Sequence, residues 1–138
     1  MKTFNERKIN RMKNERSFLR CEICGNMVGV IENSGVHIIC CGQEMTALTP
    51  NTVDASREKH VPVTSLDGNK LTVTIGSEPH PMTEAHHISW ISVAQDSLTQ
   101  RHTLNPTDAA SCEFIIHNGP ATVYAYCNLH GLWAIELP

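Results

Sequence analysis

Cysteine and histidine side chains near the C-terminus have the spacing of metal ligands. Cys127 and His130 are three positions apart and precede a glycine. A thiolate and an imidazole suit several metals, but two ligands alone do not hold a redox metal. The further candidates lie upstream: His60, His80 and His86. A fold that gathers all five would supply four imidazoles and one thiolate, with a sixth position free.

The metal at such a site is left open by the residue types. Cys127 and His130 could be half of a zinc site, and a cysteine with several imidazoles also admits copper. The prolines that flank His80 stiffen the loop that presents its imidazole. Four imidazoles around one thiolate with an open face would suit an iron that takes up an oxygen ligand, because the thiolate pushes electron density onto the metal.

Four further cysteines form a second group in the first third of the chain. Cys21 and Cys24 make a CxxC knuckle, and Cys40 and Cys41 are adjacent. Four thiolates in a tetrahedron suit either zinc or a single iron, and a zinc knuckle that folds a small subdomain is the structural alternative. The N-terminus lacks the apolar region of an export signal, so we expect a cytoplasmic protein whose cysteines bind metal instead of forming disulfides.

Turn signals and β-rich runs predict an all-β fold around these residues. A polar, basic extension covers residues 1–17, and a small metal-binding unit covers 18–50, with strands at 27–31 and 36–39 around a turn at 33–35. Residues 51–138 contain about seven short strands, which favours a small β-sandwich. These strands are expected at 61–66, 70–75, 86–94, 97–104, 111–117, 122–126 and 132–137.

Positive charge is concentrated in the first 20 residues, which hold seven of the eleven Lys and Arg residues. The rest of the chain has four basic and twelve acidic residues, a formal balance of −8. A basic tail can bind nucleic acid, but this one is short and lacks interleaved aromatic residues, which favours a solvated extension or an oligomer arm. No apolar run approaches 18 residues, so we expect no membrane-spanning helix.

The order of these motifs resembles the desulfoferrodoxin family, the two-iron superoxide reductases, over about residues 18–135. The matching segments are CEICGN at 21–26, CCG at 40–42, NTVDA at 51–55, EKHVPV at 58–63, PHPM at 79–82 and YCNLHG at 126–131. The extension before residue 18 has no counterpart expected in most relatives. Ala125 stands where relatives often have an acidic residue.

The resemblance implies two iron ions per chain in two all-β domains. A desulforedoxin-like N-terminal domain would hold the first iron, and an immunoglobulin-like β-sandwich would hold the second. The ligands of the first iron would be Cys21, Cys24, Cys40 and Cys41. The second iron would have His60, His80, His86 and His130 in its equatorial plane and Cys127 as its axial ligand.

The same resemblance implies roles for the two charged residues before His60. Glu58 would be the carboxylate that occupies the sixth position in the ferric state, and Lys59 the cation beside the open face. The spacing of the family selects His86 over its neighbour His87 as the ligand. Neighbouring residues of a strand point to opposite faces, so only one of the two can bind.

The activity implied is the one-electron reduction of superoxide to hydrogen peroxide in a homodimer, with electrons from rubredoxin or another small carrier. Two other functions compete with it. An electron-transfer protein without turnover at the second iron would gain nothing from an open sixth position beside Lys59. A zinc-ribbon interaction module that binds nucleic acid through its basic N-terminus would be colourless, whereas ferric–thiolate sites absorb visible light.

Overall fold

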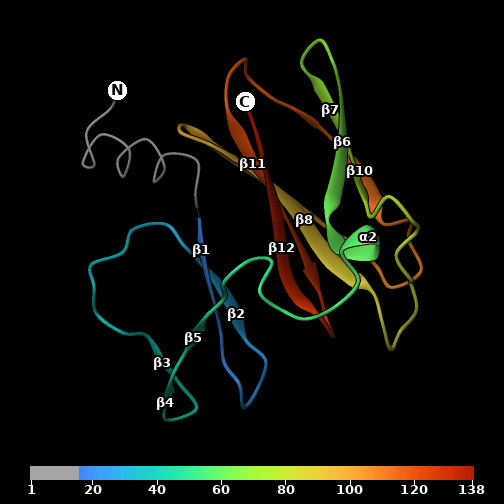
Figure 1. Cartoon of the computed structure of the whole chain (residues 1–138). Helices are drawn as coiled ribbons and strands as arrows, with labels where there is room; N and C mark the ends of the chain where they lie inside the picture. Colours follow the sequence, from blue (N-terminus) through green and yellow to red (C-terminus); the bar gives the residue numbers. More distant parts are fainter. Residues whose placement is uncertain (1–15) are drawn as a thin grey trace.

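A computed structural model describes residues 16–138, which are all-β apart from one four-residue helix (Figure 1). Most of the expected extension at residues 1–17 therefore lies outside the described residues. The N-terminal unit contains five short strands: β1 Ser17–Arg20, β2 Met27–Val30, β3 Ile39–Cys40, β4 Gln43–Glu44 and β5 Thr46–Ala47. Strand β1 is central in a sheet of order β2–β1–β5, and β3 pairs with β4.

The expected pairing of residues 27–31 with 36–39 is wrong. The turn between them does form, since Gly35 has φ +89° and its N–H donates to Asn33 Oδ1 at 2.8 Å. However, Ile31 and Val36 on either side of this turn are 98% and 77% exposed, so neither side chain is packed into a core. Strand β2 instead pairs with β1, whose Phe18 side chain is buried. Burial therefore decides the partner of β2.

Seven strands form the C-terminal sandwich, as expected. They are β6 Pro62–Asp67, β7 Lys70–Ile75, β8 Ile88–Gln95, β9 Leu98–Thr103, β10 Ser111–Ile115, β11 Ala121–Cys127 and β12 Gly131–Leu137. The sheets have the orders β10–β7–β6 and β12–β11–β8–β9. In a constant-type immunoglobulin sandwich the fourth strand joins the first, second and fifth. Here the fourth strand, β9, extends the other sheet.

Strand β11 is buried along its whole length because both of its faces are covered. Val123, Ala125 and Cys127 point into the core between the two sheets, together with residues of β7 and β8. The alternate residues Tyr124 and Tyr126 pack with Phe18 of β1 on the other face. Since side chains alternate along a strand, β11 joins the sandwich core to the N-terminal unit and places Cys127 at the end of that core.

Arg16 adds a polar connection between the two parts. Its guanidinium donates to Thr99 Oγ1 at 2.7 Å and to the Gln95 carbonyl at 2.6 Å, at the turn between β8 and β9. Its backbone N–H donates to the Tyr124 hydroxyl at 3.0 Å. These contacts fix the start of β1 against the four-stranded sheet. Within residues 16–138, no helix has the length and apolar content to cross a membrane.

Candidate metal centres

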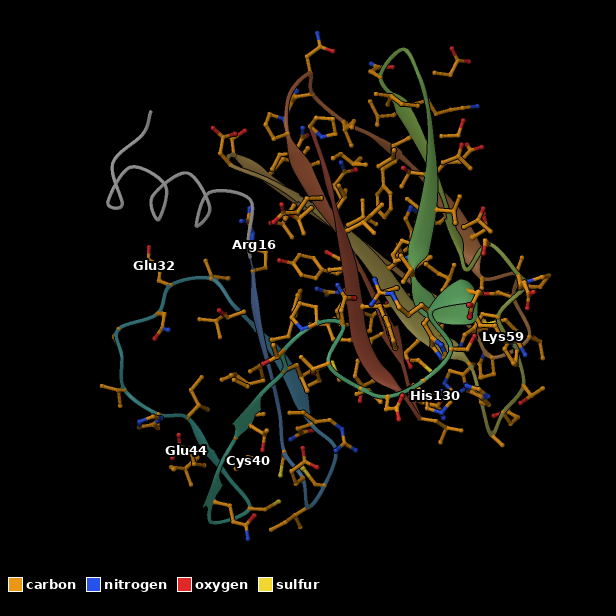
Figure 2. The ribbon with its side chains drawn as sticks, viewed as in Figure 1. Arg16, Glu32, Cys40, Glu44, Lys59 and His130 are labelled. Carbon is orange, nitrogen blue, oxygen red and sulfur yellow. The ribbon has the colours of Figure 1, made fainter. Side chains whose placement is uncertain are left out.

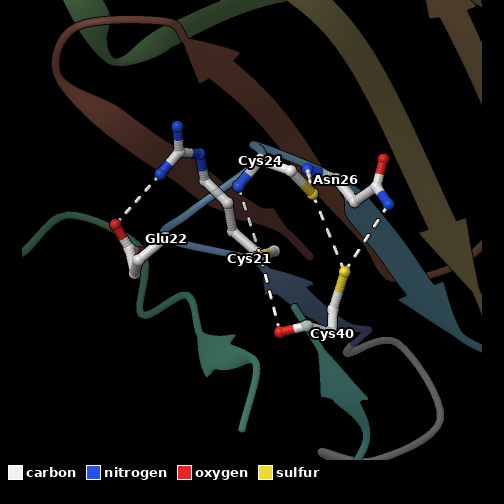
Figure 3. A network of polar contacts seen from close by, with 6 residues as sticks. Cys21, Glu22, Cys24, Asn26 and Cys40 are labelled. Carbon is white, nitrogen blue, oxygen red and sulfur yellow. Dashed lines mark hydrogen bonds and ion pairs between the residues drawn. The ribbon is translucent and has the colours of Figure 1, made fainter. Parts of the chain in front are cut away.

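The four cysteines of the N-terminal unit converge on one point. The sulfur atoms of Cys21, Cys24, Cys40 and Cys41 all lie within 4.8 Å of one another. Cys24 and Cys40 have sulfurs 3.7 Å apart (Figure 3). A tetrahedral metal with metal–sulfur bonds of about 2.3 Å has ligand sulfurs about 3.8 Å apart. The cluster therefore fits a tetrahedral ion with four thiolate ligands.

Amide donors around these sulfurs favour the ionised form of some thiols. The backbone N–H of Cys24 donates to Cys21 Sγ at 3.5 Å, and this type of contact lowers the pKa of Cys21 to about 6. Contacts with the sulfurs of Cys24 and Cys21 instead raise the pKa of Cys41 to about 12. Four thiolates this close repel one another, so ionising all four requires a cation between them.

Asn26 reaches this cluster from outside the four cysteines. Its backbone N–H donates to Cys24 Sγ at 3.4 Å, and its Nδ2 donates to Cys40 Sγ at 3.6 Å (Figure 3). The contact with Asn26 lowers the pKa of Cys40, although the neighbouring sulfurs raise it overall. The asparagine lies two positions after Cys24, but nothing in the sequence indicates that its amide faces a sulfur.

The second group is assembled from three connections at one end of the sandwich. His60 ends α2 (Arg57–His60), His80 and His86 lie between β7 and β8, and Cys127 and His130 flank the turn between β11 and β12. Figure 2 shows Lys59 at α2 beside the sandwich and Cys40 in the N-terminal unit, so the two groups belong to different parts of the molecule. The ligand atoms of His60, His86, Cys127 and His130 lie within 4.8 Å of one another.

The four imidazole rings stand at the corners of a distorted square. The ring of His60 is 4.8 Å from those of His80 and His130, and the ring of His86 is 4.8 and 5.0 Å from the same two. The diagonal between His60 and His86 is 6.3 Å. Neighbouring rings are inclined by 77–90°. His80 therefore completes a ring of four around a common centre.

Backbone carbonyls select which nitrogen of two rings faces that centre. Nδ1–H of His60 donates to the Ser56 carbonyl at 2.5 Å, and Nδ1–H of His80 donates to the Pro81 carbonyl at 2.7 Å. Such bonds leave Nε2 as the metal-binding atom. His60 Nε2 lies 3.0 Å from His130 Nδ1, close to the spacing of about 3.0 Å for ligands at right angles with bonds of about 2.1 Å.

Within residues 16–138, two ring nitrogens are buried without a hydrogen-bond partner, namely Nε2 of His80 and Nε2 of His86. An unpaired buried polar atom is costly unless something absent from the protein chain satisfies it. Burial, the main cause, lowers the pKa of His60 and His86 and lowers that of His80 to about 4, so these imidazoles stay neutral. Neutral imidazoles with orphaned nitrogens fit a metal ion.

Cys127 completes the set from the core side. Its side chain is fully buried, and its sulfur lies 3.9 Å from His130 Nδ1. Burial raises the pKa of the Cys127 thiol, although backbone N–H groups of Leu129 and His130 oppose this effect. A metal cation would reverse the balance and hold the thiolate.

Trp133 supports this site, and sequence reasoning missed it. Its ring stacks on that of His60 with centroids 5.0 Å apart, and its Nε1–H donates to the His130 carbonyl at 3.1 Å. A single indole thus contacts two of the candidate ligands. Because Trp133 is buried in β12, its sequence position resembles that of an ordinary core residue.

Glu58 and Lys59 are exposed on α2, next to the ring of four histidines. The Glu58 carboxylate accepts a hydrogen bond from Ser56 Oγ at 2.7 Å, which lowers its pKa. The positive charge of Lys59 is among the causes, after burial and neighbouring histidines, that lower the pKa of His60 and His86. The ammonium is therefore within electrostatic range of the candidate metal site.

Gly76 packs closely against the backbone of Glu58 and Lys59 in α2. It has φ +84°, and a Cβ there would lie 2.8 Å from both the Glu58 oxygen and the Lys59 carbonyl carbon. The following N–H of Glu78 donates to the Glu58 carbonyl at 3.0 Å. Only a glycine allows this close approach of two backbone segments.

The remaining histidines and the sixth cysteine stand outside both groups. His87 is excluded from the cluster, and its Nδ1 lies 2.9 Å from the Thr83 carbonyl. His37, His102 and His117 are exposed. Cys112 is half-buried against the sandwich core, and its burial raises the pKa of the thiol to about 12.

Fold and sites together define an all-β metalloprotein with a four-cysteine knuckle and a sandwich that carries a four-histidine, one-cysteine centre. Family models agree with this division: Desulfoferrodoxin, N-terminal domain matches residues 13–48, and Desulfoferrodoxin matches residues 52–136. The chain belongs to the desulfoferrodoxin family.

Individual relatives cover most of the chain. A desulfoferrodoxin of Nitratidesulfovibrio vulgaris is 40% identical over 125 residues, 91% of this chain and 99% of its own. A desulfoferrodoxin homolog of Archaeoglobus fulgidus is 43% identical over 83% of this chain and 91% of its own. The crystal structure of the superoxide reductase from Treponema pallidum superposes with a TM-score of 0.71 at 30% identity, over 88% of this chain and 99% of its own.

Proposed function

We propose that the chain is a superoxide reductase, which adds one electron and two protons to superoxide and releases hydrogen peroxide. The observation that carries the proposal is the square of four imidazoles with two orphaned buried nitrogens and a buried thiol. Membership of the desulfoferrodoxin family and the similarity to the superoxide reductase of Treponema pallidum support the same reaction.

The proposed ligands of a first iron are Cys21, Cys24, Cys40 and Cys41, and those of a second are His60, His80, His86, His130 and Cys127. The second site offers five ligands, one thiolate and four imidazoles, whereas structural zinc prefers four ligands in a tetrahedron. The second ligand set therefore favours iron over zinc. When bound, the second iron supplies the electron that reduces superoxide. The proposed two domains, 18–50 and 51–138, would then each hold one iron.

The residues of α2 have the chemistry to attract and protonate the substrate. Lys59 presents an exposed ammonium in a region whose formal charge after residue 20 is −8, so it offers a local attraction for an anion. We place superoxide beside Lys59 Nζ, which donates a hydrogen bond to it and passes on one proton, directly or through water, while solvent water supplies the second proton. Cys127 donates electron density from the buried side and so favours the transfer.

Glu58 is assigned a second role at the same face. Its carboxylate is held by Ser56 Oγ, and α2 keeps it directly before Lys59 and His60. After peroxide leaves, Glu58 can release Ser56 and take the position that the substrate occupied. The hydrogen bond from Ser56 Oγ to Glu58 therefore competes with movement of the Glu58 carboxylate into the substrate position.

Partners and location complete the proposal. A small electron carrier of the rubredoxin type would resupply the electron. A homodimer is supported by the exposed apolar side chains of Ile31, Val36 and Ile39, which a second copy could cover. The six cysteines are all free of disulfides, which supports the cytoplasm as the location.

A single-turnover reaction tests the function. Iron-loaded, reduced protein is exposed to a pulse of superoxide, and the visible absorption of the second centre is followed in time. Bimolecular oxidation of that centre by superoxide is expected, and His60→Ala should abolish it while the first centre keeps its own absorption. Absence of any reaction in the iron-loaded wild type would overturn the proposal.

A further inference from the structure

The backbone around His86 is held by hydrogen bonds from two directions. Thr83, in the same loop, provides the first: its Oγ1 accepts from the His86 N–H at 3.1 Å, and its own N–H donates to the His86 carbonyl at 2.9 Å. Both polar backbone groups of His86 are therefore satisfied locally. This leaves the ring free to point toward the other histidines.

Asn128 provides the second direction, from the turn that carries Cys127 and His130. Its Oδ1 accepts from the His87 N–H at 2.8 Å, and its Nδ2 donates to the Ala85 carbonyl at 3.0 Å. Its backbone N–H also donates to the His87 carbonyl at 3.1 Å. The side chain of Asn128 is thus hydrogen-bonded to the backbone of both neighbours of His86, Ala85 and His87.

The register of the sheet explains why a side chain is needed there. Strand β11 pairs with β8 up to Cys127 opposite Ile88, with an irregularity between Tyr126 and Cys127. One step further, an ordinary ladder would use the backbone carbonyl of residue 128 to bind the next N–H. The chain instead turns toward His130, and the amide oxygen of Asn128 takes the place of that carbonyl.

We propose that Asn128 is a positioning residue that presents His86, and not His87, to the second metal centre. The inference rests on the metal centre proposed above. By gripping Ala85 and His87, the amide fixes which of the two adjacent imidazoles faces inward, where Nε2 of His86 is buried and unpaired. The same residue follows Cys127 directly, so three ligands depend on one turn.

This arrangement lowers the cost of binding the metal, because His86 is already in place before the ion arrives. Loss of residues that orient metal ligands typically weakens binding by about 10–100-fold. Asn128→Ala should therefore weaken Fe²⁺ binding at the second site by about that factor. The Cys21-containing site should be unaffected, because it belongs to the separate N-terminal unit.

The test is an anaerobic competition between the full chain and a chelator for Fe²⁺, read from the metal retained at each site. Asn118→Ala is the matched control, since Asn118 is exposed in the connection between β10 and β11. Far-ultraviolet circular dichroism checks the fold. Should Asn128→Ala not fold, Asn128→Asp replaces it: the carboxylate keeps the acceptor for the His87 N–H but loses the donor to Ala85.

A double-mutant cycle separates positioning from general destabilisation. If Asn128 acts through His86, adding Asn128→Ala to His86→Ala, whose weakened second site is titrated at high Fe²⁺ concentration, should cost less than about threefold in affinity beyond His86→Ala alone. Equal losses in both backgrounds, or unchanged affinity in Asn128→Ala, would overturn the inference. A wild-type chain that binds no Fe²⁺ at the second site would instead overturn the proposed function, so the two failures are distinguishable.

Discussion

Replacing Gly76 with alanine should destabilise the sandwich strongly, and more than the same change at Gly68. Both glycines have a positive φ, +84° at Gly76 and +61° at Gly68. A Cβ at Gly68 would meet nothing within 4 Å, whereas one at Gly76 would lie 2.3 Å from the Glu78 oxygen and 2.8 Å from the Glu58 oxygen. The pair therefore separates backbone strain from steric overlap.

The expected magnitudes follow from these contacts. A left-handed backbone with a side chain costs about 1–2 kcal/mol, which applies to both variants. Overlap at Gly76 adds about 1–3 kcal/mol, because the atoms that would have to move are backbone. A domain of this size loses about 4–8 °C in Tm per kcal/mol, so we expect about 4–16 °C for Gly68→Ala and about 8–40 °C for Gly76→Ala.

Thermal unfolding of the iron-loaded variants at one scan rate measures the difference. The Gly76→Ala protein should also react more slowly with superoxide, because the displaced backbone is that of Glu58 and Lys59. Gly68→Ala should react at the wild-type rate. Equal Tm shifts in the two variants would refute the packing argument. A normal rate with superoxide in a strongly destabilised Gly76→Ala would show that the backbone position of Glu58 and Lys59 does not control the reaction.

Three other substitutions test individual residues. Lys59→Ala should slow the reaction with superoxide by roughly tenfold and remove its attractive salt dependence, measured by pulse radiolysis at several ionic strengths; an unchanged rate would remove Lys59 from the mechanism. His86→Ala should release or severely disturb the second iron in metal analysis, whereas His87→Ala should keep it, and the reverse would show that the wrong imidazole has been chosen. Asn26→Ala should shift the potential of the first centre by about 40 mV to more negative values, equivalent to one hydrogen bond of about 1 kcal/mol, and an unchanged potential in a redox titration would contradict the role of its amide.

Local patterns were sufficient to predict the sandwich. Its hairpin β6–β7 was expected with Asp67-Gly68 as the turn; the hairpin does form, but Asp67 pairs with Lys70, so the turn residues are Gly68, with φ +61°, and Asn69. The chemical types of the candidate ligands favoured metal binding, because few other roles require so many imidazoles and thiols. The structure brings the rings of His60, His80, His86 and His130 together from three separate connections.

Features that depend on contacts between distant segments could not be predicted. The predicted partner of β2 was wrong because the strand that it pairs with, β1, is anchored by Phe18. The ring of Phe18 packs on aromatic residues more than 70 positions away in the sequence. Helix α2 spans four residues, too short for a helical period to be visible. Asn128 reaches a backbone 41 residues away, and no local pattern encodes such a contact.

Reduction of superoxide, as opposed to its dismutation, is tested most directly by the product ratio. The iron-loaded chain is supplied with excess electron donor and a known amount of superoxide, and both hydrogen peroxide and oxygen are measured. We expect one peroxide for each superoxide consumed by the protein, with no oxygen released. One peroxide for every two superoxide ions, with oxygen evolved, or no protein-dependent consumption at all, would contradict the proposed function.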